Sequence, residues 1–116
     1  MPAKDIYHAL TRHALEQEGW MITHDPYIIT SKDDDKLLID LGAEMPIAAE
    51  RQGKKIAVEV KNFLNRSAMS DFHLALGQFM NYRFALSIHE PDRELYLAIT
   101  YDIFDNFFLN AIYKRF

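Results

Sequence analysis

The sequence predicts an α/β (α+β) fold in which helices flank a mixed central sheet. Three observations support this class. An amphipathic helical segment opens the chain, short apolar runs joined by turn signals follow it, and a long helical segment then leads to one further strand. A helix that crosses from antiparallel strands to a new strand requires a mixed sheet with helices packed on its faces.

The first half of the chain reads as one helix followed by short strands. Residues 5–18 place mostly apolar side chains at helical spacing, and Gly19 follows as a stop signal. The acidic run at residues 33–35 and the segment 51–54 are expected to be hairpin tips. The expected extended segments are residues 20–23, 27–31, 36–41, 44–50 and 55–61.

The second half alternates helix and strand. Residues 62–67 are expected to form a loop, and a helix capped by Ser67 or Ser70 runs to about Leu86. A turn at residues 90–93 leads into a buried strand over residues 94–100. A strongly apolar helix is expected over residues 102–113. This order of helix, antiparallel strands, helix, strand and helix gives the predicted αβββαβ core.

Length and composition limit the class of protein. The 116 residues suit a single domain over 1–116, and 49% hydrophobic residues indicate a globular chain. No apolar run is long enough to span a membrane, and no secretion leader is apparent. The absence of cysteine excludes disulfides and thiolate metal sites and fits a cytoplasmic protein. A net charge of −4 argues against non-specific coating of nucleic acid.

Three charged residues occupy strand positions where an apolar side chain would be expected. Side chains alternate along a strand, so Glu59 and Lys61 share one face of residues 56–61. Asp40 shares a face with Leu38, opposite Leu37, Ile39 and Leu41. If the two runs are neighbouring strands, Asp40, Glu59 and Lys61 converge. Two carboxylates and an ammonium group suit a hard divalent cation and a phosphate, although a solvated strand face with a weak ion pair is the alternative.

The long helix carries a second polar pair. Gln78 and Tyr82 are four residues apart, so they lie one above the other on a flank of the helix. Such a pair can hold a phosphate or a base, and a polar flank at the edge of the core is the alternative. The histidines at positions 8, 13 and 24 have no tight ligand spacing and are expected to be ordinary surface or core-edge residues.

The element order and the pattern Asp40 … Glu59-Val60-Lys61 resemble the PD-(D/E)XK superfamily, which has the restriction-endonuclease-like fold. This sequence has Ile39 where the superfamily motif has proline. Gln78-x-x-x-Tyr82 resembles the motif that RecB-like members carry on the following helix. The resemblance implies that Asp40, Glu59 and the Val60 carbonyl bind Mg²⁺ or Mn²⁺. It also implies that Lys61 acts on the water or the phosphate, and that Gln78 and Tyr82 position the DNA strand.

A closer resemblance, to the XisH family of fdxN element excision controlling factors, covers most of the chain. It rests on several strings: GW and ITHDP in residues 19–26, IDLGAE in 39–44, IAAE in 47–50, KIAVEVK in 55–61, ALGQF and NY in 75–82, and EPDR and LYLA in 90–98. The family implies DNA excision during heterocyst formation in cyanobacteria, beside a recombinase and a companion protein, XisI. It also implies one further strand, which would follow residue 116.

These resemblances leave three functions open. The first is a metal-dependent nuclease that acts on DNA in regulated excision. The second is a non-catalytic regulatory module on the nuclease fold, acting through DNA or an XisI-like partner. The third is a toxin–antitoxin-like or purely protein-binding domain. The acidic charge and the apolar residues Phe104, Phe107, Phe108 and Ile112 favour a protein partner, either XisI-like or a second copy in a homo-oligomer, in each case.

Overall fold

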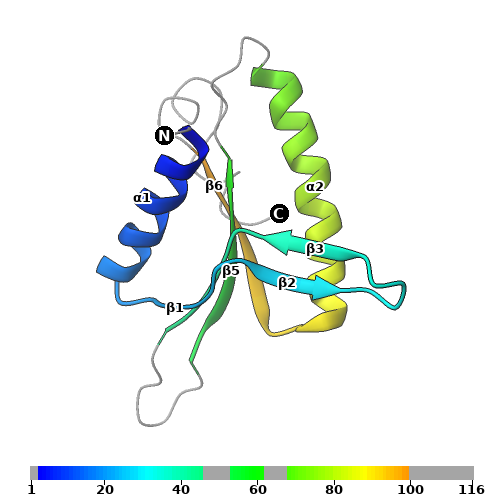
Figure 1. The fold of residues 1–116 in the computed structure, drawn as a ribbon, viewed down its shortest axis with the longest axis horizontal. Helices are drawn as coiled ribbons and strands as arrows, with labels where there is room; N and C mark the ends of the chain where they lie inside the picture. The colour runs from blue at the N-terminus through cyan, green and yellow to red at the C-terminus, as the bar shows by residue number, and fades with distance from the viewer. Residues whose placement is uncertain (1–2, 46–52, 62–67, 100–116) are drawn as a thin grey trace.

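The structure is a computed structural model that describes residues 3–45, 53–61 and 68–99. Two helices and six strands occur in these ranges (Figure 1). In chain order they are α1 (Ala3–Gln17), β1 (Met21–His24), β2 (Tyr27–Thr30), β3 (Lys36–Ile39), β4 (Leu41–Glu44), β5 (Lys55–Lys61), α2 (Ala68–His89) and β6 (Arg93–Ile99).

The central sheet contains four strands in the order β1-β4-β5-β6. The β1–β4 and β4–β5 pairs are antiparallel, and α2 crosses over so that β6 runs parallel to β5. The sheet is therefore mixed, and the predicted fold class is confirmed. Leaving out β2 and β3, the core follows the predicted αβββαβ order.

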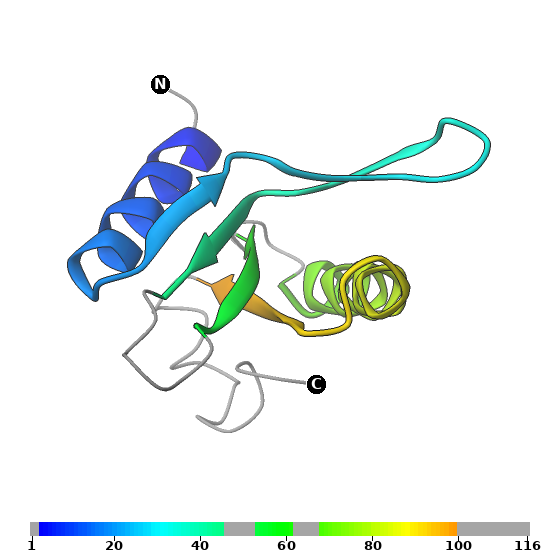
Figure 2. The same cartoon turned by 90° about the horizontal axis from the view of Figure 1, so that it is seen from below.

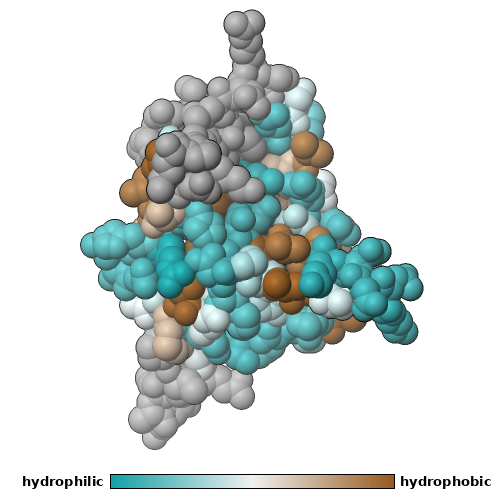
Figure 3. Space-filling view, viewed as in Figure 1, coloured by the Kyte–Doolittle hydropathy of each residue, from teal (hydrophilic) through white to brown (hydrophobic). Residues whose placement is uncertain are grey.

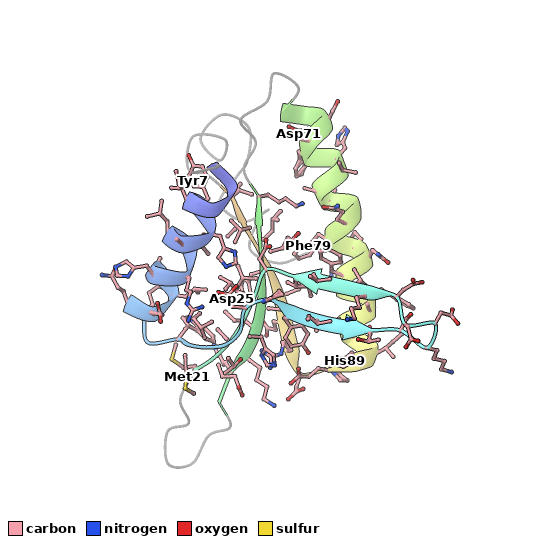
Figure 4. All side chains as sticks on the ribbon, viewed as in Figure 1. Tyr7, Met21, Asp25, Asp71, Phe79 and His89 are labelled. Carbon is pink, nitrogen blue, oxygen red and sulfur yellow. The ribbon has the colours of Figure 1, made fainter. Side chains whose placement is uncertain are left out.

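The two helices cover opposite faces of this sheet (Figures 1 and 2). On the α1 face, Leu15 and Trp20 pack against a buried cluster of Leu41, Ala43, Ile56 and Val58. On the α2 face, Phe79 and Leu86 pack against Ala57, Leu95 and Leu97. Figure 4 shows Phe79 pointing from α2 into the space between the helix and the sheet. Alternation along β5 thus sends neighbouring residues into two separate cores.

Strands β2 and β3 form a separate two-stranded sheet, which we call the arm. Its inner residues Tyr27, Ile29 and Ile39 join the core on the α2 face. Its outer face exposes the apolar residues Ile28 and Leu38, and Figure 3 shows hydrophobic surface over this part of the molecule. The arm projects past the sheet toward the side on which α2 lies (Figure 2).

The arm overturns part of the predicted strand pattern. The expected strand over residues 36–41 is two strands in two different sheets, divided at Asp40. The expectation that Ile39 and Leu41 share a face is consequently wrong, because Ile39 packs in the α2-side core and Leu41 in the α1-side core. Continuous alternation assumes an unbroken strand, and the chain leaves the central sheet at this residue.

Other boundaries differ less. The predicted extended piece at residues 20–23 is β1, and the first helix ends at Gln17, two residues before Gly19, which has φ 97°. Helix α2 runs to His89 instead of Leu86. Strand β4 ends at Glu44, and residues 46–52 of the strand and hairpin tip predicted after it lie outside the described residues. The loop at 62–67 and the helix at 102–113 also lie outside them.

A buried arginine anchors the start of β6 to the rest of the sheet. Arg93 donates from Nη1 to the Ile56 carbonyl at 2.8 Å and from Nε to Glu90 Oε1 at 2.7 Å. Tyr27 donates its hydroxyl to the same Glu90 oxygen at 2.6 Å, and its ring lies 4.8 Å from the Arg93 guanidinium carbon. Hydrogen bonds from Arg93 and Tyr27 lower the pKa of Glu90 to about 2. The guanidinium group is therefore buried as one half of an ion pair.

Neither α1 nor α2, the helices in the described part of the chain, has both the length and the apolar character needed to cross a membrane.

Candidate functional site

The candidate site begins where β4 separates from the arm. The first β4–β5 pair joins Leu41 to Val58, so the next residue back along the chain, Asp40, no longer pairs with β5 through its backbone. Its side chain turns to β5 instead, and Asp40 Oδ2 accepts the Val60 N–H at 2.8 Å. The strand break thereby fixes a carboxylate against the end of β5.

Glu59 lies in contact with Asp40 from the neighbouring strand. Alternation along β5 places its side chain on the α2 face, where it is only 6% exposed. Glu59 Oε1 accepts the backbone N–H of Asp40 at 3.2 Å. Each carboxylate therefore accepts a backbone N–H from the segment that carries the other one. The two acids are held close together where the chain that enters β4 separates from β5, which we call the fork.

Lys61 and Gln78 complete the cluster from β5 and α2. Lys61 Nζ lies 3.5 Å from Glu59 Oε2 and donates a hydrogen bond to Gln78 Oε1 at 2.7 Å. Tyr82, one helical turn after Gln78, is near enough for the carboxylates of Glu59 and Asp40 to help raise its pKa, although burial is the larger cause. The structure thus brings together Asp40, Glu59, Lys61 and Gln78, with Tyr82 at the edge.

Without a bound cation, the negative charges of Asp40 and Glu59 repel each other. Burial, followed by the negative charge of Asp40, raises the pKa of Glu59 from 4.5 to about 7. The nearby Lys61 ammonium opposes this rise without cancelling it. A cation bound between the two acids would relieve the same repulsion.

The donor set fits a hard divalent cation. Asp40 and Glu59 both offer hard carboxylate oxygens, and their side chains lie within hydrogen-bonding reach of each other. The N–H and C=O of one strand residue point to the same edge, so the Val60 carbonyl faces the edge on which Asp40 lies. Within residues 3–45, 53–61 and 68–99 no group of three His, Cys, Asp or Glu side chains could hold a metal. Further ligands would then be water or phosphate, which Mg²⁺ commonly keeps.

The sequence did not reveal two features of this site. The backbone N–H groups of Asp40 and Val60, which orient the carboxylates, have no sequence signal. The sequence predicts that Gln78 positions the DNA strand, and it does not reveal that the Gln78 carbonyl oxygen accepts a hydrogen bond from Lys61. The wide spacing of Lys61 and Gln78 along the chain conceals that contact until the crossover of α2 is known.

Comparison with known proteins identifies the family of this chain. Its sequence matches the family described as XisH protein over residues 1–116. The chain belongs to the XisH family. The family predicted from the sequence is therefore confirmed.

Two crystal structures of XisH relatives support the fold. One is of an XisH family protein from Nostoc punctiforme, with 46% identity and a TM-score of 0.74 over 91% of this chain. The other is of a fdxN element excision controlling factor protein from Anabaena variabilis, with 47% identity and a TM-score of 0.76 over 93% of this chain. This chain covers 78% of each crystallised chain. A search of the curated proteins finds no match.

Proposed function

We propose that this XisH family chain processes DNA during the excision of a DNA element, through a metal site built on Asp40 and Glu59. One observation carries the proposal: the two carboxylates meet at the fork between β4 and β5, with Lys61 within 3.5 Å of Glu59. Support for the biological role comes from the relative named as a fdxN element excision controlling factor. DNA and an XisI-like companion protein are the proposed partners.

The residues of the cluster have separate roles in this proposal. Asp40, Glu59 and the Val60 carbonyl would hold Mg²⁺ or Mn²⁺. When bound, the metal would polarise a phosphate oxygen and lower the pKa of a water molecule. Lys61 would place its positive charge beside the phosphate, where negative charge develops during phosphodiester hydrolysis. Gln78 holds the Lys61 ammonium group in position. Gln78 and Tyr82 together would position the DNA strand at the rim.

A non-catalytic regulatory function is the second candidate, and a specific contact favours it. Lys61 is already bound to both Glu59 and Gln78, so the cluster can serve as a closed internal ion pair. In that case the chain would act through DNA or an XisI-like partner without cleaving a phosphodiester. The two functions differ in whether the site cleaves a phosphodiester when metal is bound.

Calorimetric titration with Mg²⁺ and Mn²⁺ tests the choice. A metal site predicts weak binding that is lost in both Asp40→Asn and Glu59→Gln, together with metal-dependent nicking of supercoiled DNA that is lost in the same variants. Asp33→Asn is the matched control, because it removes one carboxylate from the exposed tip of the arm. Titrations that show no heat, or heat that is the same in all four proteins, would reject the metal site. Metal binding without nicking would support a regulatory function.

A further inference from the structure

Helix α2 is apolar on the side that faces away from the sheet as well as on the side that packs against it. Leu74, Phe84 and Ile88 are 67%, 67% and 70% exposed, and Met80 is 52% exposed. With Gly77 and Asn81 between them, these residues recur at intervals of three and four, which places them along one side of a helix. We call this surface the outer face of α2. The helix lies at the outside of the molecule, opposite α1 (Figure 2).

The outer face has the character of an interaction surface. Scattered exposed apolar residues are ordinary, whereas a contiguous stripe along more than three turns of one helix is typical of a docking site. Between Ser70 and His89 this side of the helix carries no carboxylate, although the chain as a whole has a net charge of −4. Two copies of this face can therefore approach each other without repulsion between acidic side chains.

The order of residues along the outer face is nearly palindromic. Asn81 is at the centre, with Leu74 seven residues before it and Ile88 seven residues after it. Gly77 and Phe84 lie at almost equal distances on the two sides. A two-fold axis through the centre would place Leu74 against Ile88 of a second copy and Gly77 against Phe84 of that copy. Such a self-complementary pattern is what a two-fold symmetric interface requires.

Gly77 provides the space that this arrangement needs. A Cβ atom added at Gly77 would have nothing within 4 Å, so the backbone there is open to the outside. In an antiparallel pair of α2 helices the large Phe84 ring of one copy would fill the hollow over Gly77 of the other. We propose that the outer face of α2 pairs with the same face of a second copy to form an antiparallel, two-fold symmetric homodimer.

The apolar side chains of the outer face supply most of the area that a small dimer interface needs, and flanking residues must supply the rest. Each of the four exposed apolar side chains offers on the order of 100 Å² for burial. Two copies would therefore bury roughly 800 Å² of apolar side chain, and flanking residues such as His73 and Ser87 would extend the contact. Specific interfaces begin at about 1,000 Å² in total. This inference does not depend on the metal site, whose carboxylates Asp40 and Glu59 are not part of α2.

Light scattering and sedimentation velocity on the full chain, over a wide concentration range, test the dimer. We expect the wild-type protein to associate to the mass of two chains. Gly77→Gln fills the hollow with a good helix former, and Phe84→Glu places a charge in the interface. Each should weaken association at least tenfold while circular dichroism shows an intact fold. Leu10→Gln is the matched control, because Leu10 is similarly exposed on α1 and should leave the dimer unchanged.

Cysteine cross-linking tests the antiparallel arrangement, because the chain contains no cysteine of its own. Asn81→Cys lies near the two-fold axis and should form a disulfide-linked dimer on mild oxidation. Leu74→Cys alone should not, whereas a mixture of Leu74→Cys and Ile88→Cys chains should. A wild-type protein that stays monomeric would overturn the proposal, and so would a dimer that survives both Gly77→Gln and Phe84→Glu. Self-linking by Leu74→Cys would overturn the antiparallel geometry.

Discussion

The carboxylate of Asp40 accepts the backbone N–H of Val60 at 2.8 Å and so replaces the strand partner that β5 loses where β4 begins. A partly buried backbone donor at the end of a strand needs an acceptor, and a side chain supplies it here. The same contact aims the carboxylate at the fork between the two strands. The residue that ends strand pairing is therefore also the residue that starts the candidate site.

We predict that Glu59 makes the metal-free protein less stable as the pH rises. Its pKa is about 7 in the folded state against 4.5 as its ordinary value, so the folded chain binds this proton more tightly. The resulting stabilisation is complete below pH 4.5 and is lost as the pH rises through about 7, an effect on the order of 3 kcal/mol. Urea unfolding of the wild-type protein and Glu59→Gln across this range should show the decline only in the wild type. Parallel pH profiles would contradict the prediction.

We expect Lys61→Ala to keep its fold and lose DNA-level activity. The substitution removes the hydrogen bond to Gln78, which should cost about 1 kcal/mol of unfolding free energy. It also removes the positive charge proposed to face the phosphate. Thermal unfolding paired with a nicking or excision assay measures both effects, and Lys54→Ala, an exposed site on the approach to β5, is the control. A large loss of stability with unchanged activity per folded molecule would assign Lys61 a structural role.

Glu90→Gln should destabilise the protein strongly. Arg93 is buried, and loss of the Glu90 charge would leave its guanidinium group without its ionic partner, at a cost of about 3 kcal/mol. Because the pKa of Glu90 is lowered to about 2, its contribution is present above its ordinary value and is lost as the pH falls toward 2. Chemical unfolding at neutral pH measures the loss. Asp92→Asn, at an exposed neighbouring carboxylate, should change stability by less than about 0.5 kcal/mol.

Two glycines should respond to alanine in opposite directions. A Cβ at Gly42 would lie 3.0 Å from Cβ and Nδ1 of His24 and from Cδ2 of Tyr27, so Gly42→Ala should cost about 1–3 kcal/mol. At Gly77 the same atom meets nothing within 4 Å in the single chain, and Gly77→Ala should stabilise the monomer, at protein concentrations below those of association, by up to about 1 kcal/mol. Denaturant midpoints of the two variants give the comparison. Equal signs would show that close packing around Gly42 is relieved by a shift of its neighbours.

Local sequence determined which residues of β5 share a face. Ile56 and Val58 pack in the α1-side core, whereas Ala57 and Glu59 face α2, as strict alternation requires. This property belongs to the extended backbone itself, so it could be read without knowing any neighbour. The crossover through α2 and the mixed sheet also followed from the order of the elements. Together with the quoted strings, they led to the correct family.

Tertiary structure alone decided the rest of the site. The break at Asp40 depends on two sheets that diverge there, and the run 36–41 reads as one strand although it contains the charged Asp40. The contact between Lys61 and Gln78 depends on how α2 packs over the end of β5. The pKa of Glu59 depends on burial and on a charge from another strand. Each of these results from groups distant in sequence meeting in space, which local periodicity does not encode.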